Sequence, residues 1–99
     1  MALATLRDAA AIEPDNPAVI ANQGVLTSDG GQPLAAIPLL ERALALDPDF
    51  HEARFNLAIA FARAGRRQEA AAQATELLKR LPATAPQRSE VERLLAAVR

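Results

Sequence analysis

The chain has 99 residues, 24 of which are alanine, and it carries a formal net charge of −1 with no cysteine. This length fits one domain with a modest core, and the lack of cysteine excludes disulfides and thiolate metal sites. No apolar run approaches the roughly 18 to 20 residues that span a membrane, and no signal peptide is visible at the start.

The charges are distributed unevenly along the chain. Residues 1–50 have two basic and seven acidic side chains, whereas residues 51–99 have nine basic and five acidic ones. The two halves therefore carry net charges of −5 and +4. A basic half can indicate an acidic partner, but the same asymmetry would also let neighbouring copies of the chain attract each other.

The first element, residues 1–16, is predicted to be the second helix of a repeat whose first helix is missing. Residues 2–16 match residues 36–50 at six positions, a shift of 34 residues, and self-similarity at a fixed period indicates a repeat protein. An unpaired helix leaves part of its apolar face, including Leu3 and Leu6, uncovered. We therefore expect either that the chain is excised from a longer protein or that a second copy covers this face in a homodimer.

The second element, residues 17–50, is predicted to be a complete repeat of two helices joined by the turn "DGGQ". Asn16 should cap the first helix, with Pro17 at the first helical position, where a missing N–H costs nothing. Pro38 falls inside the second helix, where it should remove one backbone hydrogen bond and bend the helix. The inner apolar stripe of that helix is predicted to be Leu34, Ile37, Leu40 and Leu44.

The stretch "LDPDF" separates this repeat from the next. Asp47 should end one helix, Pro48 should prevent its continuation, and Asp49 should accept the free N–H groups of the following helix. Pro14 and Pro82 lie 34 residues before and after Pro48, so the proline marks the boundary between repeats. We interpret the two carboxylates as helix caps rather than as a catalytic pair.

The third element, residues 51–84, is predicted to be a second complete repeat, and it shares five identities with residues 17–50. Gly65 should take the positive φ that ends its first helix. The segment "RRQEAAAQATELLKRL" follows as the second helix and consists largely of good helix formers. The apolar stripe of the first helix is predicted to be Ala53, Leu57, Ala60, Phe61 and Ala64.

The last element, residues 85–99, is predicted to be a C-terminal capping helix. Two overlapping capping boxes precede or begin it, Thr84 with Gln87 and Ser89 with Glu92. The opposite face of the helix is charged, which suits the end of a stack whose outer surface stays in water. Its apolar stripe is predicted to be Val91, Leu94, Leu95 and Val98.

These units resemble the tetratricopeptide repeat family, whose pattern places large apolar residues, small residues and a proline at fixed positions. Residues 17–50 supply Ile20, Gly24, Ala36, Leu40, Ala43 and Pro48, and residues 51–84 supply Leu57, Ala58, Phe61, Ala70 and Pro82. The resemblance implies an all-α, right-handed α-α superhelix of 34-residue helical hairpins. Arg54 and Ala74 depart from it, because they stand where large apolar residues are usual.

The resemblance also implies a peptide-binding groove, which the first helix of each repeat lines in this family. Carried over by position, the predicted groove residues are Asn22, Val25, Asp29, Glu52, Phe55, Asn56, Ile59 and Arg63, with Ala18, Ala21, Ser28 and Ala62 at the remaining positions. The two asparagines can pair with a peptide backbone, because an amide offers a donor and an acceptor, or can bond only within the stack. The apolar Phe55 and Ile59 can contact a partner or pack against the C-terminal helix.

Three arginines, Arg63, Arg66 and Arg67, gather around one turn. They can receive a carboxylate of a partner, or they can simply remain in solvent. The fully basic groove with which some family members bind C-terminal carboxylates is not expected, because Ala21 and Asp29 stand where cations would be needed.

Catalysis finds no support in the sequence. His51 is the only histidine and no cysteine accompanies it, so no structural zinc site is expected. No glycine-rich phosphate loop follows a predicted strand, and Ser28 has no base placed by the sequence. We predict no enzymatic activity, no catalytic residue, no metal and no cofactor.

We predict a non-catalytic protein–protein interaction module that binds an extended peptide or a helix of a protein partner. The alternative is a structural solenoid segment that self-associates through its N-terminal helix. Neither nucleic acid nor membrane is expected as a partner, since RNA binding would add aromatic or arginine side chains along a groove that has one aromatic residue. The compartment stays open between cytoplasm and periplasm, because the ending "LLKRLPATAPQR" is similar to those of bacterial family members, some of them periplasmic.

Overall fold

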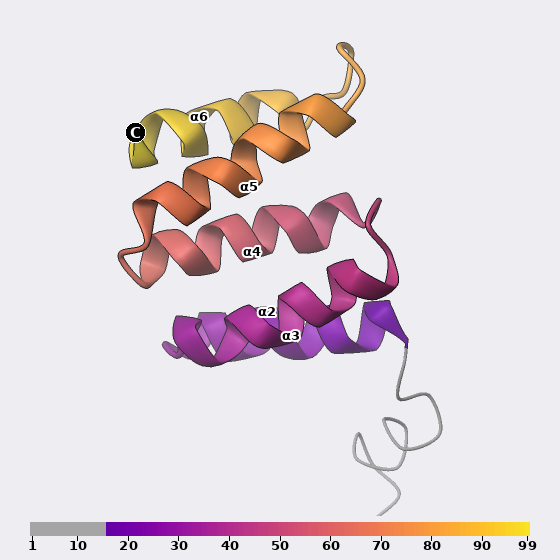
Figure 1. Cartoon of the computed structure of the whole chain (residues 1–99), viewed down its shortest axis with the longest axis vertical. Helices are drawn as coiled ribbons and strands as arrows, with labels where there is room; N and C mark the ends of the chain where they lie inside the picture. Colours follow the sequence, from indigo (N-terminus) through magenta and orange to yellow (C-terminus); the bar gives the residue numbers. More distant parts are fainter. Residues whose placement is uncertain (1–15) are drawn as a thin grey trace, which may run out of the picture.

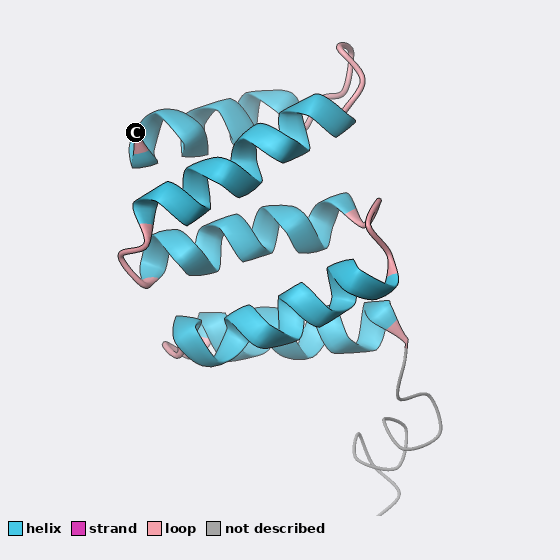
Figure 2. Cartoon of the chain, viewed as in Figure 1, coloured by secondary structure: helices cyan, strands magenta, loops and turns pink. Residues whose placement is uncertain are grey.

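The computed structural model describes residues 16–99. Within this range the chain forms only helices and short loops, without a strand (Figure 2). The helix predicted for residues 1–16 lies outside the described residues, except for Asn16. The helices are α2 (Pro17–Asp29), α3 (Pro33–Leu46), α4 (His51–Arg63), α5 (Arg67–Arg80) and α6 (Arg88–Val98).

The helices stack in chain order. Figure 1 shows α2 and α3 together at one end of the long axis, followed by α4, α5 and α6. Each helix packs on the next one along the chain, and α4 also contacts both α2 and α6. The helices α2, α4 and α6 therefore lie next to one another as one layer. The all-α fold predicted from the sequence is confirmed.

Helix α2 begins and ends as its sequence predicts. The Oδ1 atom of Asn16 accepts hydrogen bonds from the backbone N–H groups of Ala18 at 2.9 Å and Val19 at 3.3 Å, so Asn16 is the N-cap and Pro17 follows it. The chain then turns back at Gly31, whose φ of 90° favours glycine. The turn "DGGQ" thus joins α2 to α3 as expected.

The buried face of α3 differs from the predicted stripe at one end. The face consists of Ala36, Ile37, Leu40, Ala43 and Leu44, whereas Leu34 is 64% exposed. At 100° per residue, Leu34 lies about 120° from the centre of this face, too far round the helix to reach the core. The assignment of Leu34 to the inner stripe was therefore wrong.

Pro38 lies within α3, which runs through it without interruption. Its side chain is exposed, because it projects from the side of α3 opposite the buried face. The proline removes the N–H that would bond to the carbonyl of Leu34. Leu34 is itself largely exposed, so water can satisfy that carbonyl and the proline is tolerated.

The junction between α3 and α4 is built differently from the prediction. Asp47 ends α3, and its Oδ1 atom accepts the backbone N–H of Asp49 at 3.2 Å. The N-cap of α4 is Phe50, which makes no side-chain cap hydrogen bond. The expectation that Asp49 caps α4 is therefore wrong, since Asp49 precedes the N-cap by one residue and its carboxylate bonds to Arg80 at 3.0 Å.

The start of α6 also departs from the prediction, because neither capping box forms. The N-cap is Gln87, without a side-chain cap hydrogen bond, and Ser89 lies inside the first turn. The loop is fastened instead by Arg88, whose Nη1 donates to the carbonyls of Leu78 at 2.8 Å and Leu81 at 3.1 Å. A contact between distant residues has thus replaced the local cap.

The core has two parts. In the larger one, Leu40 of α3 and Leu57 of α4 are fully buried, and so are Ala53, Ala60 and Phe61 of the predicted α4 stripe. Gly65 ends this hairpin's first helix with a φ of 79°, as predicted. The smaller part joins α5 to α6 and consists of Ala74, Leu77, Leu81, Val91 and Leu95. The predicted apolar face of α6 is confirmed, because Val98 lies in the larger part and Leu94 packs against it.

Candidate functional site

A hollow of about 440 Å³ lies between α2 and α4, and we call it the α2–α4 groove. Four of the eight predicted groove residues line it, namely Asn22 and Val25 of α2 and Glu52 and Asn56 of α4. The remaining lining residues are mostly apolar: Ala18, Val19, Ala21, Gln23, Leu26, Phe50 and Ala53. The groove therefore combines an apolar floor with three amides, those of Asn22, Gln23 and Asn56, and one carboxylate.

The two asparagine amides face the groove from corresponding places in α2 and α4. Asn22 is exposed and Asn56 is half-buried. Within residues 16–99, neither side chain makes a hydrogen bond, so a bond within the stack does not account for them there. Each amide keeps a donor and an acceptor for a group that enters the groove.

Two other predicted residues, Asp29 and Arg63, lie beyond the groove and bind each other. The Nη1 atom of Arg63 donates to Asp29 Oδ1 at 3.0 Å and to Ser28 Oγ at 2.9 Å. This bridge ties the C-terminal ends of α2 and α4 together. An exposed ion pair contributes only about 0–1 kcal/mol, but it leaves Arg63 less available to a partner than the sequence suggested.

Phe55 and Ile59 do not line the α2–α4 groove. Phe55 packs against the smaller core cluster, which includes Val91 of α6, and it also lines a second hollow of about 230 Å³ between α4 and α6. Ile59 is half-buried and lines neither hollow. This second hollow was not predicted from the sequence, although the single histidine, His51, lines it.

The arginines near the α4–α5 turn are largely engaged within the chain. Arg66 donates from Nε and Nη2 to the carboxylate of Glu69 at 2.6 and 2.7 Å. Its guanidinium also lies 5.2 Å from the centre of the Phe61 ring, within the range of a cation–π interaction. This pairing supports the interpretation of the turn as solvated structure rather than as a carboxylate site.

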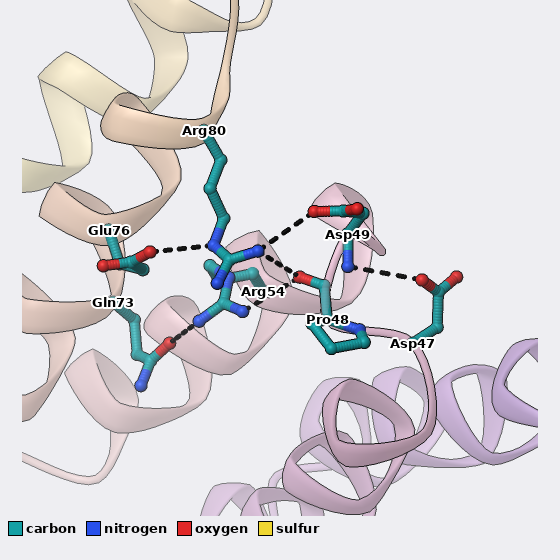
Figure 3. Close-up of polar contacts among 7 residues, drawn as sticks. All are labelled: Asp47, Pro48, Asp49, Arg54, Gln73, Glu76 and Arg80. Carbon is teal, nitrogen blue, oxygen red and sulfur yellow. Dashed lines mark hydrogen bonds and ion pairs between the residues drawn. The ribbon is translucent and has the colours of Figure 1, made fainter.

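Arg54 occupies the place where a large apolar residue was expected, and it is buried. Its Nη1 donates to Gln73 Oε1 at 3.0 Å and its Nη2 to the carbonyl of Pro48 at 3.0 Å (Figure 3). Burial lowers the pKa of this guanidinium, and the nearby charge of Arg80 lowers the pKa further. Arg54 therefore joins α4, α5 and the loop after α3 through polar bonds instead of apolar contacts.

A second arginine completes this junction from α5. Arg80 donates from Nη1 to the Pro48 carbonyl at 3.2 Å and to Asp49, and from Nε to Glu76 at 2.8 Å (Figure 3). The hydrogen bond lowers the pKa of Glu76 and raises that of Arg80. The Asp-Pro-Asp segment is thus held by two guanidinium groups that share one carbonyl, and we interpret the junction as structural.

Replacing Arg54 with alanine should lower the free energy of unfolding by about 1–3 kcal/mol, because Gln73 loses its hydrogen-bond partner and the buried stem of the arginine loses its packing. Arg54→Met should lose less, since methionine keeps the apolar stem and removes the cost of burying a charge. Urea unfolding followed by circular dichroism would measure both. Arg67→Ala, at an exposed arginine, is the control, and an equal midpoint for Arg54→Ala and Arg67→Ala would contradict a structural role for Arg54.

The geometry defines an all-α protein of stacked helical hairpins, with a groove on the layer formed by the first helix of each hairpin. The tetratricopeptide repeat family model matches residues 29–98. The chain belongs to the tetratricopeptide repeat family, whose members generally mediate protein–protein interactions and are typically non-catalytic. No curated protein matches the chain.

Among residues 16–99, no group of three or more potential metal ligands occurs. In the same range, no helix combines the length and the apolar character needed to cross a membrane.

Proposed function

We propose that the chain is a non-catalytic protein-interaction module that binds an extended peptide or a helix of a protein partner in the α2–α4 groove. The observation that carries this proposal is the pair of amides, Asn22 and Asn56, that face the groove without a hydrogen-bond partner among the described residues. Side-chain amides spaced along a groove can pair with the backbone of a ligand whatever its side chains are. The proposal thus accounts for polar groups that the fold itself does not use.

The apolar floor supports the same function. Val25 and Phe50 line the groove beside exposed Leu26, which is 61% exposed. Apolar side chains of a partner would gain about 25 cal/mol for each Å² that they bury there. The groove spans only two helices, however, so affinity for a lone peptide should be on the order of micromolar or weaker.

The test is capture of binding proteins from a lysate of the source organism by three immobilised forms of the chain. Wild type should retain a partner that the Asn22→Ala/Asn56→Ala variant retains at least about tenfold less. The control, Gln32→Ala/Gln68→Ala, removes two exposed amides that line neither hollow and should capture as much as wild type. Circular dichroism would first establish that all three forms are folded.

Equal capture by wild type and the Asn22→Ala/Asn56→Ala variant would contradict the groove assignment. It would move the interaction to another surface of the chain. Loss of capture in the control variant as well would show that any change of surface amides weakens binding, and would equally remove the support for the groove.

A further inference from the structure

The second hollow adjoins the α2–α4 groove, and we call it the α4–α6 pocket. Its walls come from the first turns of α4, from the C-terminal end of α5 and from the start of α6. Glu52 lines both hollows, so a peptide lying in the groove would pass the mouth of the pocket. A side chain of that peptide can therefore enter it.

The inner wall of the pocket is apolar. Leu77, Leu81 and Val91 line it and are almost entirely buried, and the half-buried ring of Phe55 forms another side. An aliphatic stem of several methylene groups would lose its hydration against this wall, at about 0.8 kcal/mol for each buried methylene. The wall thus favours a long side chain over a short polar one.

The charged groups of the pocket are carboxylates. Glu52 and Glu90 line it, and neither forms an ion pair or a hydrogen bond within residues 16–99. Four other acids in this part of the chain each bond to an arginine: Asp29, Asp49, Glu69 and Glu76. Among the described residues, no lysine or arginine lines either hollow, so the two free carboxylates have no neutralising cation at the pocket.

A residue that lines the pocket also has a polar atom without a partner. His51 lines the pocket, and its Nδ1 atom is buried and makes no hydrogen bond. Leaving a buried polar atom without a bond costs free energy.

We propose that the α4–α6 pocket holds an arginine or lysine side chain of the peptide that binds in the α2–α4 groove, an inference that rests on the function proposed above. The aliphatic stem lies on the apolar wall, and the cationic head lies between Glu52 and Glu90. The ring of Phe55 adds an attraction for the cation. A carboxylate would meet two like charges there, so an acidic peptide is disfavoured despite the basic composition of residues 51–99.

The test is a selection of random twelve-residue peptides displayed on phage, with the wild-type chain as the immobilised target. We expect the enriched peptides to share one position occupied by arginine or lysine. The Glu52→Gln/Glu90→Gln variant should bind such a peptide about tenfold more weakly. The control, Glu41→Gln/Glu92→Gln, changes the net charge equally at exposed carboxylates outside the pocket, and it should change the affinity less than about twofold.

A double-mutant cycle then assigns the contact. Replacing the shared basic residue of the peptide with methionine should weaken binding to wild type by the same factor of about ten. It should cause little further loss with the Glu52→Gln/Glu90→Gln variant, because both changes remove one interaction. Independent, additive losses would place the basic residue away from the two carboxylates and overturn the proposal.

The outcomes separate this inference from the proposed function. Peptides that need Asn22 and Asn56 but carry no preferred basic residue, or carry an acidic or apolar one at the shared position, would overturn the pocket assignment and leave the groove intact. Selected peptides that bind the Asn22→Ala/Asn56→Ala variant as tightly as wild type, or a selection that enriches none, would contradict the groove and the pocket together.

Discussion

Replacing Leu40 with alanine should lower the free energy of unfolding by about 2–5 kcal/mol, the range found when a fully buried leucine is truncated and leaves a cavity. Leu40 has no exposed surface and lies in the larger core cluster, against Gly24 of α2. Small domains have a total stability of only about 5–15 kcal/mol. The substitution therefore removes a large share of it, and urea unfolding followed by circular dichroism would measure the loss.

The control is the same leucine-to-alanine substitution at another position of α3. Leu34→Ala removes an equal number of atoms from a side chain that is 64% exposed, so its effect should stay within about 0.5 kcal/mol. A comparable loss for both variants would mean that α3 packs through the stripe predicted from the sequence and not through the observed face. If Leu40→Ala is largely unfolded in dilute buffer, an excluded osmolyte restores a measurable baseline for both variants.

The contrast between Leu34 and Leu40 shows how far the buried face of α3 could be predicted from the sequence. Apolar spacing fixed the existence of α3 and most of its buried face, because helical periodicity is a local property. The same spacing could not show that Leu40 packs against α2 while Leu34, at the edge of the predicted apolar stripe, stays exposed. That difference depends on Gly24, which lets the two helices approach near Leu40, and such a contact joins residues far apart in sequence.

The helix ends show the same difference between features set by neighbouring residues and features set by residues distant in sequence. Asn16 and Gly65 were predicted correctly because each acts on its own neighbours. The capping boxes predicted for the start of α6 do not form, and Arg88 instead donates to carbonyls at the C-terminal end of α5. The prediction that Asp49 caps α4 was wrong for a related reason, since the carboxylate of Asp49 binds Arg80, which is distant in sequence.

The asparagine pair of the candidate site was predictable because of the 34-residue repeat. Asn22 and Asn56 stand 34 residues apart, and equivalent positions of stacked repeats face the same side. The α4–α6 pocket depends instead on where α6 docks, and the comparison of residues 17–50 with 51–84 does not determine that position. The partners of Arg54 could not be anticipated either, because they lie in α5 and in the loop after α3.

The substitution Gly24→Ala should destabilise the chain by about 1–3 kcal/mol, the typical cost of an extra methyl in a packed core. Glycine inside a helix normally costs up to about 1 kcal/mol relative to alanine, so a helix in isolation would gain from this change. In α2 the new Cβ would lie 2.8 Å from Leu40 Cγ and 3.0 Å from its Cδ2. Leu40 is fully buried, so its side chain can yield only by displacing its neighbours in the core, and we expect the clash to outweigh the gain in propensity.

The double variant Gly24→Ala/Leu40→Ala isolates this cause, because it removes the atoms that the new methyl would meet. Residues in contact show coupling of about 0.5–3 kcal/mol. The double variant should accordingly be at least about 1 kcal/mol more stable than the sum of the two single losses predicts. Strict additivity would mean that Gly24→Ala acts through α2 alone. Gly24 would then not be what lets α2 and α3 pack closely near Leu40. The burial of Leu40 rather than Leu34 would need another physical cause.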